Sequence, residues 1–201
     1  QVGNRDEIVR MLAGHEIDLA IMGRPPAELK TTSLVFAKHP MGFLAAPNHP
    51  LMSHQGLSLS DLGKERILVR ERGSGTRTTV ERIFKDADLQ LRIGSEMSSN
   101  EAIKQMCAAG FGVAFLSMHT CVLERQGGVL QLLPMPGNPI ERDWCVMHLS
   151  SQQLPQVALA FKEFLRDHGQ ERISAQLAMP KVKPQGAAAT RQVRKTSSAG
   201  S

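Results

Sequence analysis

The chain has 201 residues, of which 41% are hydrophobic and 21% are charged, so it is long enough for one globular unit or for two small lobes. No apolar run approaches the roughly 20 residues of a membrane-spanning helix, which excludes a transmembrane protein. The opening residues lack the apolar core of a secretory signal, and the three cysteines lack metal-finger spacing. We therefore expect free thiols in a cytoplasmic protein with no membrane partner.

The formal net charge of +5 is not spread evenly along the chain. Five of the 24 basic residues follow residue 180, whereas 19 basic residues balance 19 acidic ones before it. The segment 180–201 cannot bury enough apolar area to order itself, so we predict a disordered basic tail there. The neutral remainder lacks the cationic field of a nucleic-acid-binding domain, which argues against direct DNA binding by this part.

The first half of the chain reads as one helix followed by three strands. Asn4 and Glu7 have the spacing of a capping box, and apolar residues at helical spacing continue from there to Gly14. The expected strands are 18–22, 33–38 and 41–46, and a proline-containing loop follows at 47–52.

The second half of the chain alternates strands with helices. A turn at 73–76 opens one helix, and Ser98 and Glu101 suggest a second capping box that opens another. The expected strands are 67–69, 92–97, 112–116, 129–133 and 142–149; further helices are expected at 118–126 and from about residue 154. This alternation predicts an α/β fold with a largely parallel sheet, in which ligands bind at the carboxyl ends of the strands.

The sequence carries no pattern that is specific for catalysis. The histidines lack the spacing of a helical metal pair, and no serine lies in a complete nucleophile-elbow motif. Cys107 and Cys121 lie on apolar helical faces, where a packed thiol is commoner than a nucleophile. We therefore expect neither an enzyme nor a metal protein.

Three loop-to-helix junctions carry small polar side chains beside backbone N–H groups, which suit an anionic ligand. They begin at Gly3, Gly73 and Ser98, and arginines near them could add charge. Simple helix capping is the alternative at each junction. One helix N-terminus contributes at most about 2 kcal/mol to an anion, whereas micromolar binding needs about 8 kcal/mol. A site therefore requires several junctions and arginines to converge on one cleft.

The order and spacing of these motifs resemble the effector-binding domain of LysR-type transcriptional regulators. The resemblance covers residues 1 to about 175 and is carried by the segments 3–21, 49–51, 67–77 and 99–116. It implies two Rossmann-like lobes joined by two crossover strands, as in type 2 periplasmic binding proteins. The first lobe would take residues 1–45 and 143–179, the second 48–140, with hinges near 45–47 and 141–143.

Within that family, the sequences of segments 69–77 and 97–105 are most similar to those of regulators of RuBisCO operons. This implies a transcriptional activator of carbon-fixation genes that senses a phosphorylated or nicotinamide metabolite. Ribulose bisphosphate, phosphoglycolate and NADPH are the candidate effectors, and no other cofactor is implied. The family works as a homodimer or homotetramer and binds DNA through an N-terminal winged helix-turn-helix that we expect to be missing from this fragment.

The family's effector site, carried over residue by residue, falls between the two lobes. The side chains expected to contact the effector there are Asn4, Arg5, Arg24, Arg72, Ser74, Thr76, Arg77 and Asn100. For Arg77, replacement by alanine is expected to weaken effector binding and leave folding nearly unchanged. The alternatives are a solute-binding protein of a transport system with the same fold, and a small-molecule enzyme.

Overall fold

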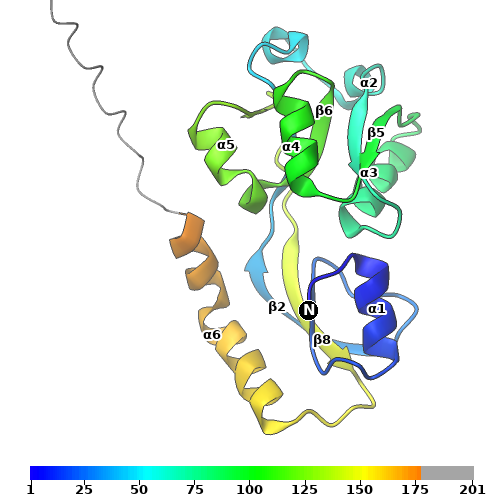
Figure 1. The fold of residues 1–201 in the computed structure, drawn as a ribbon, viewed down its shortest axis with the longest axis vertical. Helices are drawn as coiled ribbons and strands as arrows, with labels where there is room; N and C mark the ends of the chain where they lie inside the picture. The colour runs from blue at the N-terminus through cyan, green and yellow to red at the C-terminus, as the bar shows by residue number, and fades with distance from the viewer. Residues whose placement is uncertain (178–201) are drawn as a thin grey trace, which may run out of the picture.

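The computed structural model describes residues 1–177, which form two lobes joined by two crossing segments (Figure 1). The predicted basic tail, 180–201, lies outside the described residues, as do the last two residues assigned to the first lobe. Among the described residues, no helix combines the length and the apolarity that crossing a membrane requires.

Lobe I is built on a three-stranded antiparallel sheet with strand order β1-β8-β2. Its elements are α1 (Arg5–Ala13), β1 (Ala20–Met22), β2 (Thr31–Lys38), β8 (Asp143–Leu149) and α6 (Gln156–Leu177). Side chains alternate across β8, so Cys145 and Met147 pack in the cluster beneath α1, whereas Val146 packs with Leu165 of α6. The sheet is thus covered by one helix on each face.

Lobe II is built on a five-stranded sheet with strand order β5-β4-β6-β3-β7. Its strands are β3 (Met41–Ala45), β4 (Ile67–Arg70), β5 (Ile93–Met97), β6 (Val113–Ser117) and β7 (Gln131–Leu132). Its helices are η1 (Pro50–Ser53), α2 (Leu59–Leu62), α3 (Gly75–Asp86), α4 (Asn100–Ala108), η2 (Met118–Thr120) and α5 (Val122–Gln126). Phe84 of α3 packs against one face of the sheet, and Ile103 of α4 packs against the other.

The first crossing between the lobes lies at His39 and Pro40, before the position that the sequence suggested. The expected division placed 41–45 in the first lobe, but β3 pairs with β6 and β7 and belongs to lobe II. The second crossing, at Glu141 and Arg142, agrees with the expected 141–143. The crossings are hydrogen-bonded to each other, because the N–H of His39 donates to the carbonyl oxygen of Arg142 at 2.6 Å.

Two further expectations were wrong. The first was a largely parallel sheet. Within residues 1–177, only β4 makes parallel pairings, with β5 and β6, and the other strand pairs are antiparallel. The reason in lobe I is that its central strand, β8, enters from lobe II against the direction of β1 and β2. The second capping box is also absent: Ser99, not Ser98, caps α4 by accepting the N–H of Ala102, and Glu101 pairs with Lys104 instead.

Candidate functional site

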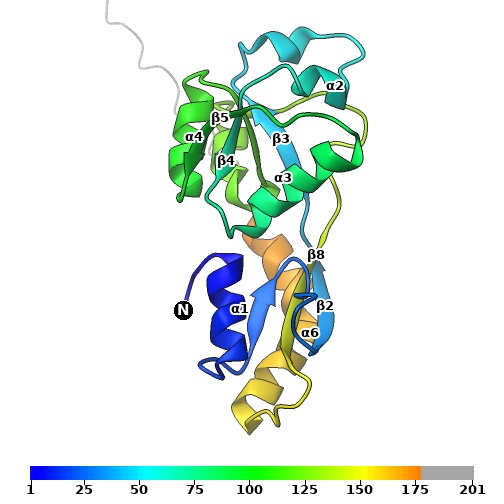
Figure 2. The same cartoon turned by 90° about the vertical axis from the view of Figure 1, so that its right-hand side faces the viewer.

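The N-terminus of α1 contacts the loop that leads into α3, so two of the predicted junctions meet across the lobe boundary (Figure 2). The backbone N–H of Asp6 donates to the carbonyl oxygen of Gly73 at 3.2 Å. Asn4 forms the predicted capping box, because its side chain accepts the N–H of Glu7 at 3.0 Å and the Glu7 carboxylate accepts the N–H of Asn4 at 2.9 Å.

The third junction is connected to the other two through Arg70 at the end of β4. The guanidinium of Arg70 donates to the Asn100 amide oxygen at 2.7 Å and to both carboxylate oxygens of Glu71. Burial works against the charged form of Glu71, but the hydrogen bond from Arg70 and a weaker one from Asn4 lower the pKa of this carboxyl. Asn4, Gly73 and Asn100 therefore lie in one region between the lobes.

The groups at these junctions are bonded to the protein itself. The backbone N–H groups of Asn4, Asp6 and Glu7 already have acceptors, and the carboxylates of Asp6, Glu7 and Glu71 add negative charge beside them. An anion placed there would be repelled by these carboxylates and would have to displace existing hydrogen bonds. In this arrangement the junctions hold the lobes together more readily than they hold a ligand.

The other predicted residues are spread over this region. Arg5 forms an ion pair with Glu28 at 3.1 Å, and its side chain approaches Gly75. Ser74 is buried and is the N-cap residue of α3, but its side chain makes no capping hydrogen bond. Thr76 is half-buried in the first turn of α3, and the exposed Arg72 lines a small hollow of about 270 Å³ together with residues of α3.

Arg77 is held inside lobe II. Its side chain is only 5% exposed, donates to the Arg70 carbonyl oxygen at 3.1 Å and forms ion pairs with Glu81 and Glu96. Burial disfavours the charged guanidinium, but the two carboxylates outweigh it and raise the pKa of Arg77. These contacts describe a side chain that joins α3 to β4 and β5.

A group of three arginines lies where the lobes meet beneath α3; we call Arg24, Arg82 and Arg142 the arginine cluster. Arg24 follows β1 in lobe I, Arg142 lies in the second crossing, and Arg82 lies on α3 of lobe II. Burial, followed by the charges of Arg82 and Arg24, lowers the pKa of Arg142. Within residues 1–177, none of the three forms an ion pair.

The arginine cluster has a polar neighbour on each side of the boundary. Arg142 donates a hydrogen bond to the hydroxyl of Thr79, which lies one turn before Arg82 on α3. His39 of the first crossing is 7% exposed, and burial, with His119 and Arg142 nearby, lowers its pKa to about 3. The sequence analysis included only Arg24 from this group, because Arg82 and Arg142 lie in no motif.

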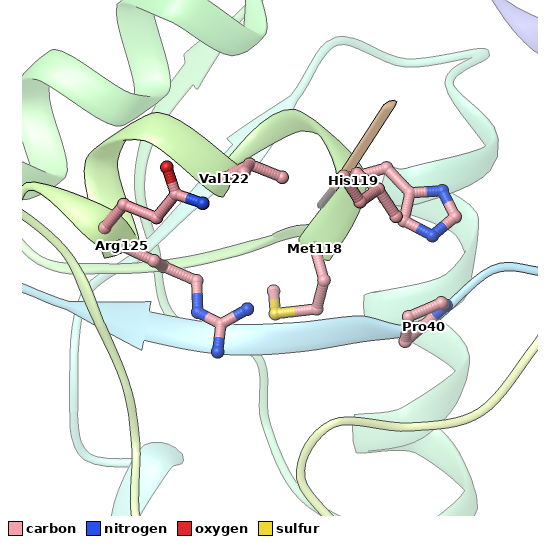
Figure 3. A pocket seen from close by; sticks show the side chains of 7 residues that line it. Pro40, Met118, His119, Val122 and Arg125 are labelled. Carbon is pink, nitrogen blue, oxygen red and sulfur yellow. The ribbon is translucent and has the colours of Figure 1, made fainter. Parts of the chain in front are cut away.

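A second hollow, of about 380 Å³, lies where the end of α6 approaches lobe II. Figure 3 shows Pro40, Met118 and Arg125 around it; Leu177 also lines it. None of the predicted site residues lines this hollow. His119 also lines this hollow. It is joined to β8, just after the second crossing, because Trp144 donates a hydrogen bond to His119 Nδ1 at 3.3 Å.

Within residues 1–177, no three histidine, cysteine or acidic side chains lie close enough together to hold a metal ion. Arg5, Arg70 and Arg77 at the junctions are each paired with a carboxylate, whereas the three arginines of the cluster have no carboxylate partner among the described residues.

Residues 1–170 match the family described as the LysR substrate binding domain. The chain is 43% identical over 169 residues to the transcriptional regulator CfxR of Cupriavidus necator, and 37% identical over 164 residues to the RuBisCO operon transcriptional regulator of Allochromatium vinosum. These alignments cover 84% and 82% of this chain but 53% and 54% of the relatives. The chain thus spans about half the length of the curated relatives it matches.

The fold also matches the regulatory domain of Synechocystis CcmR, solved in complex with 2-phosphoglycolate (2-PG). The TM-score is 0.78 and the identity 34%, over 83% of this chain and 80% of that one. The named relatives are transcriptional regulators, which agrees with the expectation that the chain is not an enzyme and disfavours the transport alternative. The chain belongs to the LysR substrate-binding domain family and is an effector-binding domain close to the regulators of carbon fixation.

Proposed function

We propose that this domain senses a small phosphate-bearing anion that binds between the lobes at the arginine cluster. The observation that carries the proposal is the position of Arg142, which is bonded to Thr79 on α3 of lobe II and lies beside Gly23 of lobe I. Arg24 follows Gly23, Arg82 lies one turn after Thr79, and none of the three arginines has a carboxylate partner among the described residues. Gathering like charges is unfavourable unless an anion compensates them. Arginine also suits phosphate and carboxylate groups, because its planar fork donates two parallel hydrogen bonds.

The cluster can supply an affinity in the useful range. A hydrogen bond to a charged group contributes about 1.5–3 kcal/mol, so three arginine contacts together approach the roughly 8 kcal/mol of micromolar binding. Thr79 and the α3 N-terminus could add to this. The junction residues Asn4, Ser74, Thr76 and Asn100, with Arg5 and Arg72 beside them, would then fix the arrangement of the lobes around the ligand.

Phosphoglycolate is our first candidate for the effector. The CcmR regulatory domain, 34% identical to this chain, was solved with 2-PG. This molecule is short and carries negative charge at both ends, which matches a cluster with one half-buried guanidinium and two exposed ones. Ribulose bisphosphate and NADPH are larger phosphate-bearing candidates for the same site.

In the whole protein, we propose that this domain controls the activation of carbon-fixation genes. The support is the similarity to the RuBisCO operon regulator. The full-length regulator would act in the cytoplasm as a homodimer or homotetramer and bind DNA through a region outside this chain. An effector that contacts both lobes prefers one inter-lobe arrangement, and a coupling of about 1–3 kcal/mol is enough to shift an assembly between two states.

Isothermal titration calorimetry with 2-PG, ribulose bisphosphate and NADPH tests the proposal, with glycolate as the ligand that lacks phosphate. We expect the Arg142→Ala variant to bind the preferred ligand at least about tenfold more weakly, because it loses a charged hydrogen bond. Arg166→Ala is the matched control, since the Arg166 side chain is exposed on the surface of α6 and pairs with Asp167. Equal affinity of Arg142→Ala and wild type would refute the assignment to the arginine cluster.

A further inference from the structure

The His39 ring is fixed in the first crossing by one residue from each lobe. It stacks on Trp144 of β8, with ring centroids 3.7 Å apart and an interplanar angle of 15°. Its Nε2 lies 3.0 Å from the hydroxyl oxygen of Ser117, the last residue of β6. Trp144 belongs to lobe I and Ser117 to lobe II, so the ring orientation is set by both halves of the molecule.

The other ring nitrogen, Nδ1, is buried and has no hydrogen-bond partner among the described residues. Such groups are rare in folded proteins, because burying a polar atom without a partner is costly. The Ser117 hydroxyl oxygen accepts the backbone N–H of His119 at 3.3 Å, and its own proton can be donated to His39 Nε2. When Ser117 donates in this way, the neutral ring carries its proton on Nδ1, as a donor without an acceptor.

This nitrogen and the Arg142 guanidinium border the same small space. A β-carbon at position 23 would lie 3.4 Å from His39 Nδ1 and 3.7 Å from Arg142 Nη2. Because residue 23 is glycine, no side chain occupies that position. Arg24, the next residue along the chain, is a member of the arginine cluster.

We propose that His39 is a ligand-contacting residue, whose Nδ1–H donates a hydrogen bond to the anion held by the arginine cluster. The inference rests on the proposed function and adds to it a donor that no motif indicates. The required acceptor is an anionic oxygen of a phosphate or carboxylate. Because Nδ1 is buried and Arg142 Nη2 borders the space next to Gly23, we expect the Arg142 side chain to move toward the bound anion and to uncover Nδ1.

This contact explains how a ligand could act on both lobes at once. The same ring that would donate to the ligand contacts Ser117 at the end of the lobe II sheet and Trp144 in the lobe I sheet. A neutral imidazole offers one donor in one fixed direction. It therefore selects a ligand whose anionic group reaches the crossing, in addition to neutralising the arginines.

Two substitutions at position 39 separate the two ring nitrogens. The amide of glutamine falls near the place of Nε2, so His39→Gln preserves a bond to Ser117 but loses the donor at Nδ1. The amide of asparagine falls near Nδ1, so His39→Asn preserves the donor. We expect calorimetry with 2-PG to show at least about tenfold weaker binding by His39→Gln and a change below about threefold for His39→Asn.

Imidazole ¹⁵N NMR of the wild-type chain provides the second measurement and needs no substitution. We expect 2-PG to shift the His39 Nδ1 resonance while that nitrogen remains protonated. If 2-PG binds and Arg142→Ala weakens it, but His39→Gln binds like wild type or the Nδ1 resonance stays in place at saturation, the inference is wrong and the proposed function stands. If no phosphate ligand binds the wild-type chain, both fail.

Discussion

The backbone N–H of Asp6 donates a hydrogen bond of 3.2 Å to the carbonyl oxygen of Gly73, which joins the start of α1 in lobe I to the loop before α3 in lobe II. The two crossing segments connect the lobes covalently (Figure 1). The Asp6–Gly73 contact therefore closes the side of the molecule opposite to the chain crossings, and its loss would free the lobes to separate there.

Gly73→Ala should weaken this closure. Gly73 has a φ of +85°, and a β-carbon there would lie 3.0 Å from Asp6 Oδ2. We expect the free energy of unfolding to fall by about 1–3 kcal/mol, because a non-glycine residue in this conformation is strained. Gly56→Ala is the matched control, since Gly56 has a φ of +68° and no atom within 4 Å of such a β-carbon. Urea denaturation measures both, and equal losses would show that the contact with Asp6 contributes nothing.

Arg77→Ala should destabilise the fold, which differs from the outcome expected from the sequence. The substitution removes the partner of Glu81 and Glu96 and leaves the Arg70 carbonyl oxygen without its donor. We expect a loss of about 1–3 kcal/mol in urea denaturation, because a charge-assisted network is broken. Arg72→Ala, at an exposed position in the loop before α3, should change stability by less than about 0.5 kcal/mol. Unchanged stability of Arg77→Ala would contradict the structural role.

The stability of the chain should fall in acid partly through His39. Burial lowers the pKa of His39 from 6.5 to about 3, so the unfolded chain takes up a proton first as the pH falls. The stabilisation from the neutral ring is complete above pH 6.5 and is lost between pH 6.5 and about 3, by up to about 1.4 kcal/mol per pH unit. Urea denaturation from pH 7.5 to 4.5 tests this with His39→Gln, which cannot titrate. A constant difference between the two proteins over that range would be evidence against it.

The three cysteines should be unreactive in the folded chain. Cys107 and Cys121 are fully buried and Cys145 is 5% exposed. Burial raises the pKa of all three thiols, that of Cys107 to about 11, which depletes the reactive thiolate. We expect Ellman's reagent to detect no rapid reaction in buffer and three thiols in denaturant. Fast modification of one thiol in buffer would show local opening at that cysteine.

Helix ends that are marked by residues close together in the sequence were predicted well. The capping box of Asn4 and Glu7 is present, and α1 ends before Gly14, because both signals lie within one helical turn. Patterns without such local signals were less informative. The two expected strands, 33–38 and 41–46, were assigned to one lobe, and only the change from the partly exposed β2 to the fully buried β3, near Pro40, indicates that they belong to different sheets.

The candidate site was only partly predictable. Helix-start motifs identified Asn4 and Asn100, but not that Asp6, Glu7 and Arg70 would already occupy the bonding groups around them. Arg142 and His39 lie at the crossings, where position depends on how two sheets share the chain. Without the topology, nothing in the sequence indicates that they lie beside Arg24.

The hydrogen bonds on the lobe II side of the two crossing segments also restrict how the halves can move. The N–H of Met41 donates to the Ile140 carbonyl oxygen at 3.0 Å, and the N–H of Ile140 donates back at 2.7 Å. Two strands paired in this way cannot slide past each other without breaking both bonds. Relative motion is therefore confined to bending and torsion of a single ladder, which gives the domain one shared axis of rotation in place of two independent pivots.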